Sequence, residues 1–165
     1  VLATMVAKYK QIATSTNLEQ RAKSVGMTPY QVLTIASLLE VEGHPRDFAK
    51  VARVVYNRLA EPMRLEFDST VNYGLGKTDV ILTQADLDKD TPYNTYRRDG
   101  LPPTPIDNPG EAAITAALNP ASGDWLYFIT VDLATQETRF TRSYSEFLGW
   151  KDEFLAYCSA NPGTC

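Results

Sequence analysis

The chain has 165 residues, 44% of them hydrophobic and 22% charged, which is the composition of an ordinary globular domain that can bury its own core. Its 20 acidic and 16 basic residues give a net charge of -4, and no Lys/Arg cluster offers the basic face that nucleic-acid binding needs. We therefore expect a single domain over residues 1–165 and no nucleic-acid partner.

The chain contains neither a signal peptide nor an apolar run approaching the roughly 20 residues that span a bilayer. It begins at Val1 rather than at a methionine. We therefore expect a trimmed segment of a longer protein, whose native membrane anchor has been removed.

The first half of the chain carries three helical patterns. Residues 2–24 are predicted to form one helix, within an N-terminal helical lead-in of residues 1–30. A capping box with proline at the first helical position, residues 28–31, starts the next helix. This helix is apolar on nearly all sides, so we expect it at the centre of the domain. A third helix is predicted over residues 46–60, and the apolar–polar alternation of residues 63–67 predicts a half-buried strand.

The second half is expected to hold a long loop, short helices and a hairpin. Residues 91–110 are polar and rich in proline and tyrosine, and a loop of that length inside a compact domain is usually functional. We therefore interpret it as an active-site loop. The other predicted elements are a turn over residues 74–79, a short helix from residue 83, a helix over residues 111–118, a hairpin of residues 125–131 and 138–142, and a last helix from residue 143. Together these patterns predict an α+β fold: one helix-dominated domain with a small antiparallel sheet and a central buried helix.

The two cysteines, Cys158 and Cys165, lie in a C-terminal tail of residues 158–165. A metal site would need further Cys or His ligands at short spacing, but the only histidine, His44, is far away in sequence. A redox Cys-x-x-Cys spacing is also absent. Two free thiols in a cytosolic protein are one interpretation. We expect instead a disulfide between the two, which favours an oxidising compartment, and we expect no metal site.

Glu40 and Glu42 end a helix that is otherwise almost uncharged. Glu42 continues the apolar stripe of Ile35 and Leu38, and it lies at the negative end of the helix dipole. Partial burial and the dipole both raise a carboxyl pKa, and a carboxyl group protonated near neutral pH suits general acid cleavage of a glycosidic bond. Glu40 lies about 200° around the helix from Glu42, so a supporting role is expected for it. That both glutamates merely solubilise a helix end remains an alternative at this point.

Several segments match the blocks of a known family in order and in spacing. Residues 35–42 match an Ala-Ser-Ile-hydrophobic-Glu-Lys-Glu signature, residues 54–59 a Tyr-Asn-Arg-Leu block, residues 65–74 a Leu-Gln-x-Asp-Pro-Thr-Val-x-Tyr-Gly block, residues 91–96 and 100–103 a distinctive loop, and residues 125–128 and 140–141 a closing hairpin. On these residues the chain resembles the YceG/MltG family of endolytic murein transglycosylases from about residue 34 to residue 154. It departs from the family pattern at Val41, Ser69 and Thr104, where Lys, Pro and Gly are more usual.

The resemblance implies roles for particular residues. The second glutamate of the signature is catalytic in the family, and it falls on Glu42, which would protonate the leaving oxygen and then act as base on the sugar's own C6 hydroxyl. A hydrolase would need a second carboxylate about 5–9.5 Å away, and Asp68 is the loop acid considered for that role. Supporting roles are expected for Glu40, Asn57 and Asp68, and substrate contacts for Thr70, Tyr93, Asn94 and Tyr96.

The implied function is cleavage of the β-1,4 bond between MurNAc and GlcNAc in peptidoglycan, leaving a 1,6-anhydro-MurNAc end. The resemblance places this activity on the extracytoplasmic face of the cell membrane, in cell-wall synthesis or remodelling, with cell-wall synthases as expected partners of the native protein. No cofactor is implied, and we expect the isolated domain to be a monomer. Two alternatives remain open, namely a noncatalytic peptidoglycan-binding module and a muramidase that hydrolyses the same bond.

Overall fold

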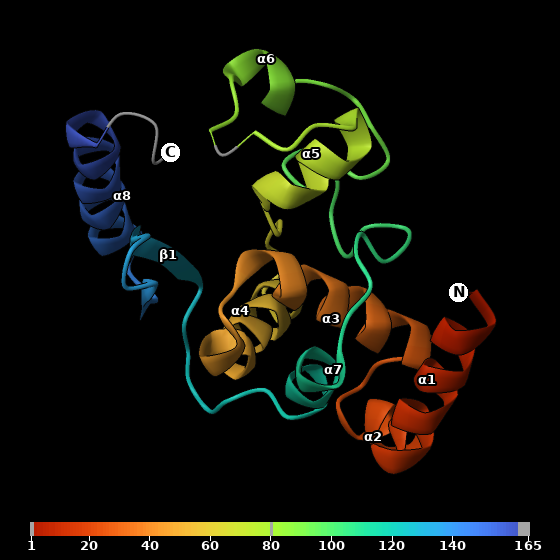
Figure 1. The fold of residues 1–165 in the computed structure, drawn as a ribbon. Coiled ribbons are helices and arrows are strands. Elements are labelled where there is room, and N and C mark those ends of the chain that lie inside the picture. Colours follow the sequence, from red (N-terminus) through yellow and green to blue (C-terminus); the bar gives the residue numbers. More distant parts are fainter. Residues whose placement is uncertain (1, 80, 162–165) are drawn as a thin grey trace.

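The computed structural model describes residues 2–79 and 81–161, and it confirms a helix-dominated α+β fold with one small antiparallel sheet. Figure 1 shows the helices forming the body of the molecule, with the sheet and the last helix at one side. The elements are, in chain order, α1 (Leu2–Ser15), α2 (Leu18–Ser24), α3 (Pro29–Glu42), a 3-10 turn (Pro45–Asp47), α4 (Phe48–Ala60), α5 (Asp68–Leu75), α6 (Gln84–Leu87), α7 (Glu111–Leu118), β1 (Tyr127–Asp132), β2 (Glu137–Thr141) and α8 (Tyr144–Ala160).

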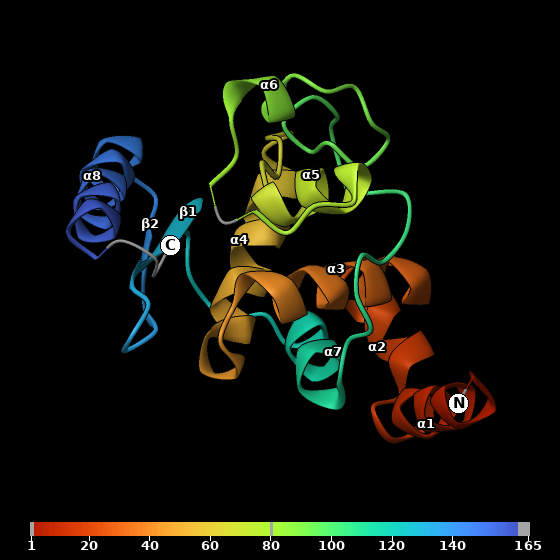
Figure 2. The same cartoon turned by 45° about the horizontal axis from the view of Figure 1, so that its top comes forward.

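Helix α3 is the centre of the fold, as predicted. It starts with a capping box in which the Thr28 hydroxyl accepts from the Gln31 N–H and the Gln31 side chain accepts from the Thr28 N–H. Ile35, Leu38 and Leu39 are fully buried, and each such side chain contributes about 1.5–3 kcal/mol relative to an exposed one. Helices α4 and α7 pack directly on α3, which lies in the middle of the helical body in both views (Figures 1 and 2).

The hairpin and α8 form a separate small layer. Strands β1 and β2 pair antiparallel, with Tyr127 opposite Thr141 and Phe128 opposite Phe140. Helix α8 begins where the Ser143 side chain accepts from the Glu146 N–H, and it packs mainly on β1. None of its described residues is fully buried, and Figure 2 shows this layer beside the helical body rather than inside it. The hairpin and the last helix were both predicted from the sequence.

The prediction of one helix over residues 2–24 was wrong, because the chain breaks between α1 and α2. Asn17 adopts a left-handed backbone conformation, with φ of 50°, which a right-handed helix does not allow. Asparagine tolerates this conformation better than most residues do. The side chain of Asn17 also donates to Gln20, at the start of α2.

The strand predicted over residues 63–67 was also wrong. Leu65 and Phe67 are buried, as the alternation suggested, but no neighbouring strand pairs with them. The backbone N–H groups of Glu66 and Phe67 instead donate to Thr95, one to its carbonyl and one to its hydroxyl. Glu66 has a left-handed backbone with φ of 52°, which no regular strand contains. The apolar–polar alternation of residues 63–67 therefore reflects the burial of alternate side chains in a segment that pairs with no strand.

Helix α5 was not predicted, although its first residues were expected to matter. Gly74 lies inside it, and a Cβ atom at that position would be 2.5 Å from the Thr91 hydroxyl oxygen and 3.3 Å from the Tyr93 Cβ. The glycine thus lets the start of the long loop pack directly against α5. Residues 91–110 form no helix or strand, as predicted.

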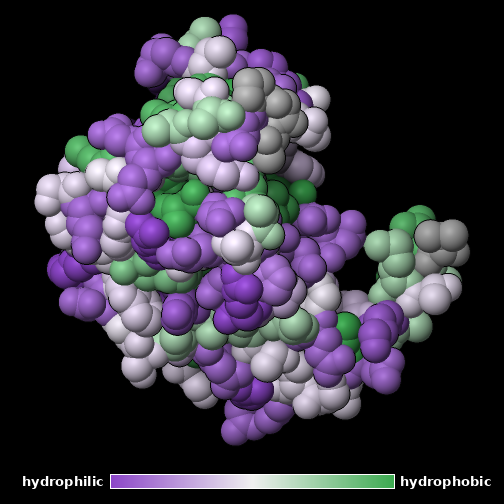
Figure 3. Space-filling view, turned by 60° about the vertical axis from the view of Figure 1, so that its left-hand side comes forward, coloured by the Kyte–Doolittle hydropathy of each residue, from purple (hydrophilic) through white to green (hydrophobic). Residues whose placement is uncertain are grey.

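Cys158 is disulfide-bonded, whereas Cys165 lies outside the described residues, so their pairing stays a prediction. Among residues 2–79 and 81–161, no helix combines the length and the apolar character required to cross a bilayer. On the face seen in Figure 3, hydrophilic side chains predominate, and strongly hydrophobic atoms show mainly in hollows between them.

Candidate active site

Glu42 is the last residue of α3 and is partly buried. Removal from water raises the pKa of its carboxyl group to about 7, against an ordinary value of 4.5. The negative charge of Asp68 acts in the same direction, whereas Ser69 and the more distant Arg58 favour the ionised form. Near neutral pH the carboxyl group is therefore divided between its protonated and ionised forms, which is the state required of a group that first gives and then takes a proton.

Ser69 faces Glu42 from the first turn of α5. Its hydroxyl and its backbone N–H both lower the pKa of the Glu42 carboxyl, against the larger effect of burial. The Ser69 hydroxyl oxygen is fully buried and has no hydrogen-bond partner of good geometry among the described residues. The Ser69 hydroxyl is therefore a buried donor beside the Glu42 carboxyl group. The positive end of the α5 dipole acts in the same direction.

Asp68 and Tyr96 connect this centre to the long loop. The Tyr96 hydroxyl donates to Asp68 Oδ1 at 2.5 Å, although the two residues are 28 positions apart in sequence. Burial, first, and the Asp68 carboxylate both raise the pKa of Tyr96 above its usual value, so its proton stays on the phenol. The structure thus brings Glu42, Asp68 and Tyr96 together from α3, α5 and the loop.

Arg58 is a buried cation on α4 that supports the same region. Its guanidinium donates to the carbonyls of Leu126 and Leu65 at 2.6 and 2.5 Å, and it lies 3.9 Å from the Glu66 carboxylate. It also lies 5.2 Å from the ring centre of Tyr127. These contacts fix the segment that leads to α5 and the segment that leads into β1.

Asn57 has a supporting position, but away from the long loop. Its amide donates to the carbonyls of Gly123 and Trp125, which tie α4 to the chain before β1. Glu66 is a residue that the sequence reasoning missed. Its strained left-handed backbone and half-exposed carboxylate beside Arg58 lie in the segment leading to Asp68. No sequence pattern marks a positive φ at a glutamate.

Glu40 holds the end of the long loop and is not among the groups that act on Glu42. Its carboxylate accepts from the Gly110 N–H at 3.1 Å, at the residue that caps α7. Ser37, one turn earlier in α3, accepts from the Ile106 N–H at 3.0 Å. The end of the loop therefore runs along α3 and is fixed to it at two points.

Of the four residues expected to contact substrate, Thr70 and Asn94 are fully buried, whereas Tyr93 and Tyr96 are half-buried. The Asn94 side chain is fully buried, donates to the carbonyls of Leu87 and Lys89, and accepts from the Tyr96 N–H. Thr70 is also fully buried and bonds to Thr95 and Phe67, while Tyr93 packs on Tyr73 and bonds to Thr104. These residues shape the loop and its contact with α5. Tyr96 is the one whose side chain reaches Asp68, beside Glu42.

One partly buried acid, set between two helices and a fixed loop, is the arrangement of a general-acid site. No group of His, Cys, Asp or Glu in the described part of the chain could hold a metal ion. The model of the YceG-like family matches residues 1–153, nearly the whole chain. The chain therefore belongs to the YceG-like family, as the sequence motifs indicated.

Named relatives agree with this membership. The chain is 34% identical over 157 residues to the endolytic murein transglycosylase of Bacillus subtilis (strain 168), covering 94% of this chain and 42% of that protein. It is 39% identical over 113 residues to the endolytic murein transglycosylase of Streptococcus pneumoniae serotype 2, covering 65% of this chain and 20% of that protein. The crystal structure of a YceG-like protein from Listeria monocytogenes superposes with a TM-score of 0.71 at 38% identity, covering 87% of this chain and 44% of that one. The chain thus spans less than half the length of these relatives.

Proposed function

We propose that this domain cleaves peptidoglycan glycan strands as a lytic transglycosylase, with Glu42 as its single acid and base. The observation that carries the proposal is a partly buried glutamate with a pKa of about 7, at the position of the family's second signature glutamate. The names of the relatives from B. subtilis and S. pneumoniae support murein as the substrate.

The proposed reaction needs one carboxyl group and no water. Protonated Glu42 gives its proton to the oxygen of the β-1,4 bond as the bond from MurNAc C1 breaks. The resulting carboxylate then takes the proton from the MurNAc C6 hydroxyl, whose oxygen bonds to C1 and closes the 1,6-anhydro ring. The enzyme returns to its starting protonation state. Donors on Ser69 support the carboxylate, whereas burial supports the acid, so the two halves of the cycle are balanced.

Asp68 is better suited to positioning than to attack on the sugar. One of its oxygens accepts from the Tyr96 hydroxyl, and its charge raises the pKa of Glu42. A muramidase with Asp68 as the second carboxylate remains the competing enzyme function. Action outside the cytoplasm, attachment to the membrane and contact with cell-wall synthases belong to the same proposal for the whole protein.

Mass spectrometry of purified peptidoglycan digested by this domain tests the proposal. We expect new glycan ends that carry 1,6-anhydro-MurNAc, each lighter by one water than a hydrolysed end. Reducing MurNAc ends as the main product would identify a muramidase. Tight binding to the same peptidoglycan without any new ends would identify a binding module.

A further inference from the structure

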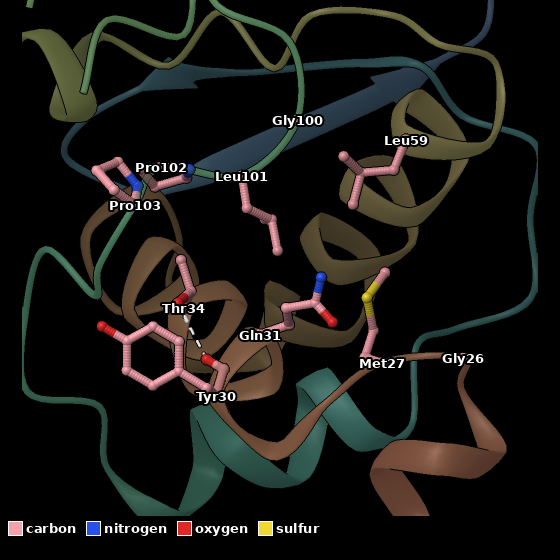
Figure 4. Close-up of a pocket in the computed structure, with 10 residues that line it drawn as sticks. All are labelled: Gly26, Met27, Tyr30, Gln31, Thr34, Leu59, Gly100, Leu101, Pro102 and Pro103. Atoms are coloured by element: carbon pink, nitrogen blue, oxygen red, sulfur yellow. Dashed lines mark hydrogen bonds between the residues drawn. The ribbon is translucent and has the colours of Figure 1, made fainter. Parts of the chain in front are cut away.

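A pocket lies at the opposite end of α3 from Glu42. It has a volume of about 470 Å³, within the range of small-molecule sites, and it is formed by the start of α3, the end of α4 and residues 100–103 of the long loop (Figure 4). None of its lining residues is charged. It therefore suits a neutral group better than an ionic one.

The lining combines an apolar wall with one free amide. Met27, Leu59 and Leu101 supply the apolar side chains. Gln31 Oε1 accepts from the Thr28 N–H at 2.9 Å. Because an N–H can bond only to an acceptor, this contact shows which end of the Gln31 amide is the oxygen. The Gln31 nitrogen therefore points the other way, among these apolar side chains in Figure 4, and has no hydrogen-bond partner among the described residues.

The pocket and Glu42 lie on the same side of α3. Eleven residues separate Gln31 from Glu42, which corresponds to about 16 Å along the helix and a rotation of only about 20°. The same loop borders both places, because Tyr96 reaches Asp68 beside Glu42 and Leu101 lines the pocket. An extended chain lying along α3 can therefore touch both.

We propose that this pocket binds an N-acetyl group of a sugar unit distant from the cleaved bond. The acetyl methyl group packs against Leu59, Leu101 and Met27, and the acetyl carbonyl accepts from the Gln31 amide. This inference rests on the proposed function, because it takes the bound polymer to be a glycan of N-acetylated sugars. It explains how a strand is held some way from its cleavage point, which an enzyme that cuts within a strand requires.

The test uses the domain with Glu42→Gln, so that no probe is cleaved, and NMR of its Met and Leu methyl groups. Oligomers of N-acetylglucosamine long enough to span both sites should shift the resonances of Met27, Leu59 and Leu101. Cello-oligosaccharides of equal length, which lack acetyl groups, should leave them unchanged. Equal shifts with both sugars, or no shift with the acetylated one, would overturn the inference.

Gln31→Glu is the matched variant, because glutamate keeps the capping box and removes the amide donor. We expect an unchanged melting temperature and an affinity about two- to tenfold weaker, the value of one neutral hydrogen bond. Gln31→Ala should also lose the bond from the Thr28 N–H, which is half of the capping box, and melt lower. Full affinity in Gln31→Glu would contradict the inference, even if wild-type digests contain anhydro ends. Digests without anhydro ends would contradict the proposed function. The NMR and affinity measurements would still show whether the pocket binds an N-acetyl group.

Discussion

In the proposed reaction Glu42 serves as both acid and base, and its neighbours act on its pKa in opposite directions. Burial raises the pKa of the carboxyl group, whereas Ser69 lowers it with a hydroxyl and an N–H at the start of α5. The site reaches a pKa of about 7 by opposing two effects rather than by burial alone. The hydroxyl is present because serine stands where the family more usually has proline.

Ser69→Ala should raise the pKa of Glu42, because it removes a donor to the ionised form while leaving burial unchanged. The general acid is protonated below its pKa, so the fall of kcat/KM on the alkaline side should move to higher pH. Ser69→Pro removes the N–H as well and should move it further, since proline is tolerated in the first turn of a helix. The measurement is a pH–rate profile of all three proteins, and superimposable alkaline limbs would rule out this role for Ser69.

Glu42→Gln should stabilise the fold at high pH. Between pH 4.5 and about 7 the Glu42 carboxyl group ionises in the unfolded chain but stays protonated in the folded one. The free energy of unfolding of wild type therefore falls as pH rises through this range and is lowest above it. The variant does not ionise. We expect it to be more stable than wild type at pH 8, by on the order of 3 kcal/mol at most, and the difference to shrink towards pH 4. Urea unfolding at both pH values measures this, and an equal difference at both would contradict the assigned pKa.

At the scale of elements, the long loop is positioned by a few polar contacts, some buried and one exposed. Asn94 ties the loop to residues before it, and Ser37 and Glu40 tie its end to α3. A proline-stiffened loop held at several points keeps its shape before a ligand arrives, which lowers the entropy lost on binding.

Asn94→Ala should therefore act mainly on stability. It removes three hydrogen bonds of a fully buried amide and leaves the carbonyls of Leu87 and Lys89 without their donor. We expect a loss of about 2–4 kcal/mol in thermal or urea unfolding, with activity falling as the loop loosens. Asn108→Ala, at an exposed position of the same loop, is the control. A variant that unfolds like wild type but no longer binds glycan would instead support the direct contact predicted from the sequence.

The elements that the sequence predicted well are those whose signals are local. The capping box at Thr28 and the serine cap at Ser143 fix where α3 and α8 begin. Residues 63–67 and α5 were misjudged because their partners are distant: Thr95 bonds the first segment, and Tyr93 packs on the second through Gly74. Nothing near them in sequence indicates these contacts.

The same distinction holds for the site. The partial burial of Glu42 could be predicted because its position in the apolar stripe of its helix is local. Asp68 and Tyr96 stand in the family blocks, but no local pattern indicates that they bond to each other. The buried roles of Asn94 and Thr70 could not be predicted, since a polar residue in a loop has the same sequence whether it contacts ligand or backbone.

At the scale of the whole molecule, α3 organises both the fold and the proposed activity. Its buried middle joins α4 and α7, its C-terminal end carries Glu42, and its N-terminal end borders the pocket of Figure 4. The loop of residues 91–110 follows the same helix from one end to the other. A rigid helix of this kind fixes the distance between the acid and any remote contact with the strand.

The turnover of peptidoglycan by Glu42→Gln and by Glu40→Gln, measured side by side at pH 6, tests the central claim most directly. The two glutamates are on the same turn of the same helix. Each variant removes one carboxylate while the side chain keeps nearly the same size. We expect Glu42→Gln to lose at least about 10²-fold in rate, the lower range for general acid catalysis, and Glu40→Gln to stay within about tenfold of wild type. Activity of Glu42→Gln within tenfold of wild type, or equal losses in both, would contradict the assignment of Glu42 as the catalytic acid.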